Sequence, residues 1–268
     1  MDDPLRPERR PVASTAPVEA DRREEPSGWL PCYAWWPRPE DYSVTVVLTP
    51  YHATVDPEAE FRFVLRGYAG SPTPEWEREA GRVRFGEQRA VRLDDLELPD
   101  PPEHGGVLEV HAIRLDAAPP KGTKFLGMWV DAHGRRGGGY LAPTVPIQGA
   151  AKLLARDDLQ VVPGIVASRE LESEVVLLNP TRSGTTARLV VTSPDGLSAE
   201  GAPFDVAPWS AWHGVLSAEV PRVRRLLEPS GGVGSLSIYS GQRLLPFFGM
   251  RRTGGPLTSM DHTAPIFA

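Results

Sequence analysis

Apolar and polar residues alternate along many short stretches of this chain. In EFRFVLRGY (60–68) the alternation is that of an antiparallel strand with one face in solvent. Other short runs, rich in β-branched residues and bounded by turn residues, predict strands at 42–49, 81–86, 89–96, 106–115, 124–132, 173–179, 185–193, 203–208, 211–217, 231–240 and 242–250. Only LDDLEL (93–98) and AEVPRVRRLL (218–227) favour short helical turns. The pattern predicts an all-β protein made of antiparallel β-sandwiches.

The pattern also repeats within the chain. PCYAWWPRPEDYSVTVVLTP (31–50) aligns without a gap to VVPGIVASRELESEVVLLNP (161–180). Three further pairs of segments follow in the same order: GGVLEVHAIR (105–114) with GGVGSLSIYS (231–240), KFLGM (124–128) with PFFGM (246–250), and PTVPI (143–147) with HTAPI (262–266). We predict an internal duplication that gives two tandem homologous β-sandwich domains, 29–150 and 158–268, with a linker at 151–157.

The first 28 residues differ from the rest. They mix acids, arginines and prolines with hardly any large apolar side chains. Such a segment buries too little surface to offset the entropy lost on ordering, so we predict a disordered N-terminal tail at 1–28. The alternative is a tail that becomes ordered on a neighbouring subunit.

A dense group of aromatic residues opens the first predicted domain. In the strand that PCYAWW predicts, Cys32, Ala34 and Trp36 share one face, while Tyr33 and Trp35 share the other. One face enters the core of the domain, so the aromatic residues on the other face need a second surface to cover them. Aromatic anchors are typical of domain and subunit contacts, which is our preferred interpretation for Tyr33 and Trp35. A stacking platform for a ligand, with Trp36 included, is the alternative.

Composition narrows the class of protein. The net charge is −6 and the pI about 5.6, which disfavours a nucleic-acid binder. Cys32 is the only cysteine, so an intrachain disulfide and a cysteine-based zinc cluster are both excluded. No signal-peptide pattern and no long apolar run is visible in the sequence, so we expect a cytoplasmic protein without membrane insertion.

The sequence offers little chemistry. No two of the six histidines have the HxH or HxxxH spacing of a metal site. His133 and His262 each follow a Met-containing strand and could help to hold copper, but those strands fit a core better, so we expect no metal and no other cofactor. Arg135 and Arg136 in HGRRGGGY, and Arg251 with Arg252, could bind an anionic ligand.

The second half of the chain resembles a known family. Its LLNP strand, the run VAPWSAWHGVL leading into LSAEV, and the GSLSIYS–LLPFFGMRRT hairpin are similar in order to the small β-sandwich of the soluble sensory rhodopsin transducer family. The resemblance implies a non-enzymatic, oligomeric sandwich that binds partners or small ligands. That family has one domain per chain, and no site residue is carried over from it.

These observations favour a non-catalytic binding or assembly protein, an adaptor or structural subunit that recognises a protein partner or forms a homo-oligomer. One alternative is a binding protein for a small ligand, a sugar or an anionic metabolite, held by the aromatic residues and the arginine pairs. The other is a hydrolase that uses scattered His, Asp and Ser residues.

Overall fold

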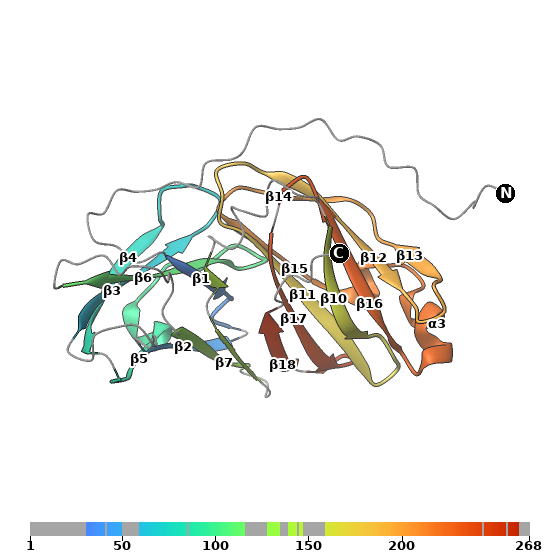
Figure 1. The fold of residues 1–268 in the computed structure, drawn as a ribbon, viewed down its shortest axis with the longest axis horizontal. Helices are drawn as coiled ribbons and strands as arrows, with labels where there is room; N and C mark the ends of the chain where they lie inside the picture. Colours follow the sequence, from blue (N-terminus) through green and yellow to red (C-terminus); the bar gives the residue numbers. More distant parts are fainter. Residues whose placement is uncertain are drawn as a thin grey trace.

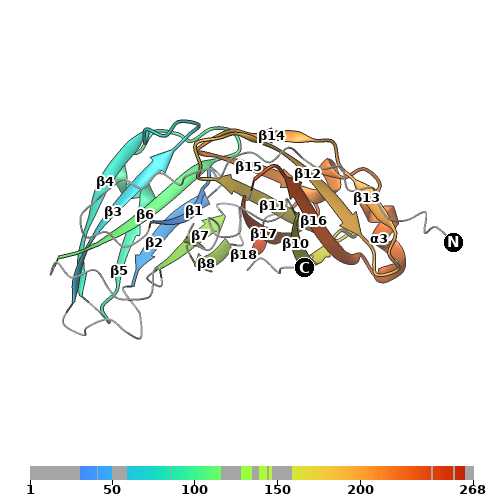
Figure 2. The ribbon, with the colours of Figure 1, turned by 45° about the horizontal axis from the view of Figure 1, so that its top comes forward.

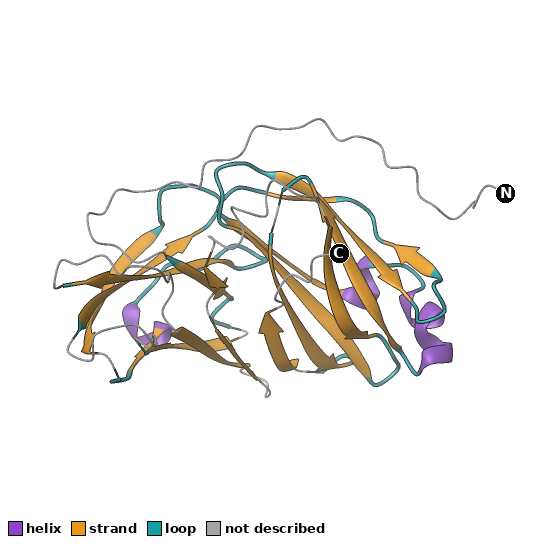
Figure 3. Cartoon of the chain, viewed as in Figure 1, coloured by secondary structure: helices purple, strands orange, loops and turns teal. Residues whose placement is uncertain are grey.

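The computed structural model confirms an all-β protein (Figure 1). It describes residues 31–40, 42–49, 59–84, 86–115, 128–134, 139–143, 145–146, 159–242, 244–255 and 257–262. The predicted tail (1–28) and linker (151–157) lie outside these ranges. Strands dominate and the helical segments are short (Figure 3). Within the described ranges no helix is long and apolar enough to cross a membrane.

Residues 32–146, the first half, form two antiparallel sheets. Sheet A has the order β4-β3-β6-β1-β9 and sheet B the order β5-β2-β7-β8. The strands are β1 (Cys32–Trp36), β2 (Tyr42–Leu48), β3 (Glu60–Tyr68), β4 (Trp76–Arg84), β5 (Arg89–Arg92), β6 (Gly106–Arg114), β7 (Met128–Gly134), β8 (Gly139–Pro143) and β9 (Val145–Pro146). The expected helical turn in LDDLEL is the 3-10 segment η1 (Leu93–Leu96).

Residues 159–262, the second half, form two more sheets. Sheet C has the order β10-β16-β12-β13, with β14 also paired to β12, and sheet D the order β15-β11-β17-β18. The strands are β10 (Leu159–Val166), β11 (Leu171–Asn179), β12 (Thr185–Thr192), β13 (Ser198–Glu200), β14 (Phe204–Val206), β15 (Ser210–Val215), β16 (Val233–Ser240), β17 (Leu245–Arg252) and β18 (Leu257–His262). The expected helical turn at 218–227 is divided between α2 (Leu216–Glu219) and α3 (Val223–Leu227), and the 3-10 segment η2 (Glu228–Ser230) follows.

The two halves have the same strand order. β13-β12-β16-β10 of sheet C corresponds to β4-β3-β6-β1 of sheet A, and β15-β11-β17-β18 of sheet D corresponds to β5-β2-β7-β8 of sheet B. The register agrees with part of the sequence alignment, since Cys32 lies opposite Val110 and Val162 lies opposite Leu236. The FLGM and FFGM motifs do not correspond: Met128 lies opposite Leu48 at the end of β2, whereas Met250 lies opposite Ser173 near the start of β11. The shared order fits an internal duplication, which stays a prediction.

One hydrophobic core crosses from the first half into the second. It contains residues of sheets A and B together with Val176, Leu178, Trp209, Ala211, Leu245 and Phe247 of the second half. The alternate residues Val175 and Leu177 belong to the second half's own core. Because side chains alternate along a strand, β11 is buried on both faces, one against sheet C and the other against the first half. The edge strands β8 and β18 also lie side by side (Figure 2).

Candidate functional site

The aromatic side chains of β1 are buried. Tyr33, Trp35 and Trp36 are each 3% exposed. Trp36 packs edge-on against Trp76, with ring centroids 5.4 Å apart, inside the first half. Tyr33 and Trp35, on the opposite face, contact the second half instead. This burial favours the contact interpretation of the two residues over an exposed stacking platform.

Trp209 of the second half reaches into a socket of the first half. We define the socket by Tyr33, Tyr68 and Gly70. The Trp209 ring stacks on the Tyr68 ring, with centroids 4.5 Å apart and planes 30° apart, and meets the Tyr33 ring edge-on at 6.3 Å. The backbone N–H of Gly70 donates to the carbonyl oxygen of Trp209 at 2.8 Å. The first half therefore holds both the indole and the backbone of this residue.

The turn that carries Trp209 is fixed from within the second half. Asn179 is fully buried, and its amide donates to the carbonyl oxygens of Val206 and Ala207. The backbone N–H of Trp209 donates to the carbonyl of Thr181 at 3.2 Å. Trp209 itself has a φ of +51°, a left-handed backbone conformation that residues other than glycine rarely adopt. Its buried indole Nε1 has no hydrogen-bond partner among the described residues.

A second contact between the halves involves Trp35 and two histidines. The rings of Trp35 and His213 have centroids 5.0 Å apart. The indole Nε1 of Trp35 donates to the carbonyl of His104 at 3.0 Å. The Nδ1 of His104 in turn lies 3.0 Å from the carbonyl oxygen of His213, and because a carbonyl only accepts, this nitrogen carries the proton. These contacts, together with the Trp209 socket, form what we call the aromatic joint.

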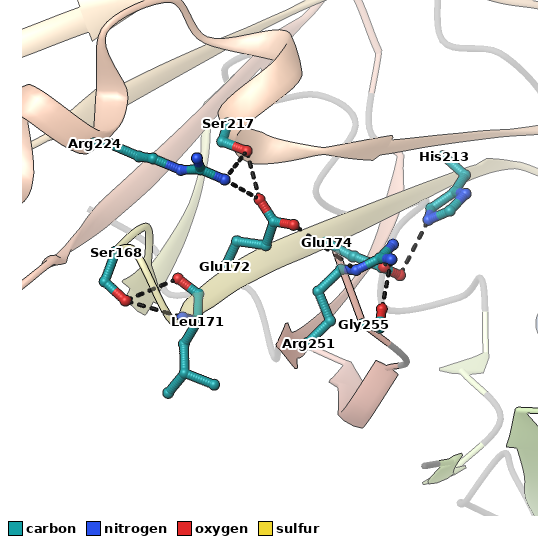
Figure 4. Close-up of polar contacts among 9 residues, drawn as sticks. All are labelled: Ser168, Leu171, Glu172, Glu174, His213, Ser217, Arg224, Arg251 and Gly255. Atoms are coloured by element: carbon teal, nitrogen blue, oxygen red, sulfur yellow. Dashed lines mark hydrogen bonds and ion pairs between the residues drawn. The ribbon is translucent and has the colours of Figure 1, made fainter. Parts of the chain in front are cut away.

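His213 connects the aromatic joint to a buried charge network (Figure 4). Its Nε2 lies 3.2 Å from Glu174, a carboxylate on β11 that is 1% exposed. Arg251 of β17 donates from its guanidinium to the other oxygen of Glu174 at 2.5 Å and to the carbonyl of Gly255. Burial alone would raise the pKa of Glu174, but the hydrogen bond from His213 and the charges of His213 and Arg251 hold it below its ordinary value.

The network continues at Glu172, two residues earlier on the same face of β11. Ser217 and Arg224 both donate to one oxygen of Glu172, at 2.5 and 2.8 Å (Figure 4). Arg251 lies 3.8 Å from the other oxygen. Burial opposes ionisation here too, but the hydrogen bonds from Ser217 and Arg224 lower the pKa of Glu172. Both carboxylates are thus held ionised by the hydrogen bonds and positive charges around them.

A row of polar residues adjoins the Trp209 socket and includes its residue Tyr33. Tyr33, Glu109, Arg66 and Glu77 lie opposite one another across β1, β6, β3 and β4. The guanidinium of Arg66 donates to Glu109 at 2.8 Å and to Glu77 at 2.6 Å, and the hydroxyl of Tyr68 donates to Glu109 at 3.2 Å.

The same row shifts two pKa values. Burial tends to lower the pKa of Arg66, but the hydrogen bonds to Glu77 and Glu109 raise it overall. Burial and the charge of Glu109 raise the pKa of Tyr33 well above its usual value. The guanidinium of Arg66 therefore stays charged, and the phenol of Tyr33 stays neutral, throughout the ordinary pH range.

The structure separates the other predicted site residues. Arg251 forms ion pairs with Glu172 and Glu174, whereas Arg252 is exposed at the end of β17. Arg135 and Arg136 lie outside the described residues. His133 and His262 lie on β7 and β18, and the structure does not describe their side chains. In the part of the chain that the structure describes, no group of three His, Cys, Asp or Glu residues could hold a metal ion.

The central residues of the aromatic joint were not predicted from the sequence. Trp209, Tyr68, His104 and Glu174 belong to no local motif, and their partners are distant along the chain. The one local signal is VAPWS (206–210), in which Pro208 and Trp209 lie in the turn between strands β14 and β15. A large aromatic residue in a turn is exposed unless another surface covers it, so its position indicates a contact.

No family model matches the sequence, and no curated protein matches it either.

Proposed function

We propose that this chain is a non-catalytic binding or assembly protein in which two β-sandwich halves act as one body. The observation that carries the proposal is the aromatic joint. Tyr33, Trp35 and Trp209, large aromatic residues of the kind that anchor protein contacts, hold the first half against the second. A shared hydrophobic core adds to this contact. Such a body keeps its loops and sheet edges in fixed positions for a protein partner or another copy of the chain.

The buried charges support a structural role over a catalytic one. A general acid or base near neutral pH needs a proton that it exchanges with a substrate and a pKa close to the working pH. Glu172 and Glu174 instead have lowered pKa values and are bound by Arg224 and Arg251. Arg66 is likewise bound between Glu77 and Glu109. These groups neutralise one another inside the protein, which suits a rigid scaffold.

The resemblance to the soluble sensory rhodopsin transducer family favours the same class of protein, and a cytoplasmic location is part of the proposal. In that family the sandwich is a single domain per chain. Here the pairing of two sandwiches is achieved within one polypeptide.

Native mass spectrometry of the purified full-length chain, before and after gentle activation, tests this proposal. We expect a defined oligomer, or a complex with a protein partner, that carries no small extra mass. A monomer with a bound metabolite or metal ion would overturn the proposal in favour of a small-ligand binding protein.

A further inference from the structure

We propose that the edge of β10 that faces away from β16 is a strand-addition site, and that its occupant is the segment of the same chain that follows β18, residues 263–267. Within the described residues β10 pairs with β16 alone and is an edge of sheet C (Figure 1). An open edge presents backbone N–H and C=O groups to an extended segment, so its natural partner is a β-strand. The sequence continues past β18, which ends at His262.

The first half has a strand at the corresponding edge. There β9 follows β8 and adds to β1, the strand that corresponds to β10. In this pairing Cys32 lies opposite Pro146 and Tyr33 lies opposite Val145. Cys32 and Val162 are matched in the alignment of the two halves, and both are fully buried. The position that β9 takes on β1 therefore has a direct equivalent on β10.

The segment after β18 has a sequence that fits this position. PTVPI (143–147), which contains β9, matches HTAPI (262–266). Ala264 and Pro265 thus take the places of the two paired residues of β9. The register expected from β9 sets Ala264 opposite Pro163 and Pro265 opposite Val162, and the residues that follow run antiparallel along β10 toward Leu159.

The connection also has the required length. From Val46, buried on β2, the register leads across β7 to Ala142 on β8. From Val175, buried on β11, it leads across β17 to Asp261 on β18. β8 and β18 each end at the next residue, and a single residue separates β8 from β9. One linking residue after β18 is therefore enough to bring the segment alongside β10.

The shape of the β10 edge favours a short occupant. Pro163 has no backbone N–H to donate, and the register shifts between Pro163 and Ile165, where Gly164 has a φ of +78°. Regular pairing on this edge is therefore confined to Leu159–Pro163. The segment 263–267 matches that stretch in length, whereas a long strand of another protein would meet the irregularity at Gly164.

Residue-resolved hydrogen exchange on the full-length chain tests the proposal. Pro265 has no N–H, so Ala264 is the member of the pair that can donate to β10. Ala264→Pro removes this donor, and Ala264→Ser keeps it as the matched control. The amides of Gln160–Val162 that point away from β16 should be protected in the wild type and in Ala264→Ser. In Ala264→Pro they should exchange at least about tenfold faster, while the amides of β12 keep their rates.

A second variant, a chain that ends at His262, removes the segment altogether and should lose the same protection at β10. Equal exchange of these amides in the wild type and both Ala264 variants would overturn the proposal, as would protection that survives in the shortened chain. The wild-type protection should also be independent of protein concentration. Protection that falls on dilution would place the segment of another copy on the edge, and docking within one chain would be wrong.

Discussion

Trp209 stacks on Tyr68 although the two residues belong to different halves of the chain, with ring centroids 4.5 Å apart. Trp209 ends a turn of the second half and Tyr68 ends a strand of the first. A backbone hydrogen bond from Gly70 to Trp209 reinforces the contact. Substitutions in the aromatic joint should therefore lower the stability of both halves of the chain.

Trp35→Ala should destabilise the chain by about 3–5 kcal/mol, because it removes a buried indole between Tyr42 and His213. Trp35→Phe keeps a ring there and loses mainly the hydrogen bond to His104, so its cost should be about 1–2 kcal/mol. Urea unfolding measures both. As a control, Leu197→Ala at an exposed position should change stability by less than about 0.5 kcal/mol. If Trp35→Ala destabilised the chain by no more than Leu197→Ala does, Trp35 would not be part of a stabilising contact between the halves.

Arg66→Met should cost about 3–5 kcal/mol, because it leaves the carboxylate of Glu109 buried without its cation. Arg62, two residues earlier on β3, provides the matched control. Its ion pair with Glu79 is exposed and 3.7 Å long, so Arg62→Met should cost at most about 1 kcal/mol. Thermal or urea unfolding gives the loss of stability in each variant. Equal losses for Arg66→Met and Arg62→Met would show that the buried ion pair of Arg66 with Glu109 adds no more stability than an exposed one.

Glu174→Gln should weaken the dependence of stability on acid. The folded-state pKa of Glu174 lies below its ordinary value of 4.5. The ionised carboxylate thus contributes stability that is fully present above about pH 4.5 and is lost as the pH falls through the lower folded-state pKa. Glutamine does not titrate, so the free energy of unfolding of the variant should fall less steeply below that pH. Urea unfolding at several pH values between 3 and 7 measures this free energy for both proteins. If it fell equally steeply with pH in the wild type and in Glu174→Gln, the ionised Glu174 would not stabilise the fold.

Asn179→Ala should loosen the turn that carries Trp209. The Asn179 amide donates to the carbonyl oxygens of Val206 and Ala207, and its loss removes a hydrogen bond from each, at about 1–3 kcal/mol for each carbonyl that is left buried without a donor. The amide of Gly70 donates to Trp209 and reports on the contact between the halves. Hydrogen exchange at Gly70 should therefore accelerate in the variant more than exchange in β12. Unchanged exchange at Gly70 would mean that Asn179 does not position Trp209.

The sequence predicted the fold class because strand signals are local. The alternation in EFRFVLRGY corresponds to β3, and the aromatic run PCYAWW contains β1. The register of Cys32 with Val110 and of Val162 with Leu236 follows the alignment of the two halves. In contrast, FLGM and FFGM matched in letters but not in position, because a short apolar motif fits several places along a strand.

The candidate site was much less predictable. Arg66 binds Glu109, and Arg251 binds Glu174, across strands that are far apart in the sequence. Whether an arginine is exposed or bound to a glutamate depends on sheet order and register, which the sequence pattern does not determine. The sequence therefore allows Arg251 to be an anion ligand, whereas the structure pairs it with carboxylates. The position of Tyr33 and Trp35 on one face was predictable, but the identity of Trp209 as their neighbour was not.

A double-mutant cycle between Tyr68 and Trp209 tests the aromatic joint most directly. The free energies of unfolding are measured for the wild-type chain, Tyr68→Ala, Trp209→Ala and the double variant. Stacking across the two halves predicts a favourable coupling energy of about 0.5–1.5 kcal/mol. Additive losses, with a coupling energy near zero, would mean that the two rings do not hold the halves together.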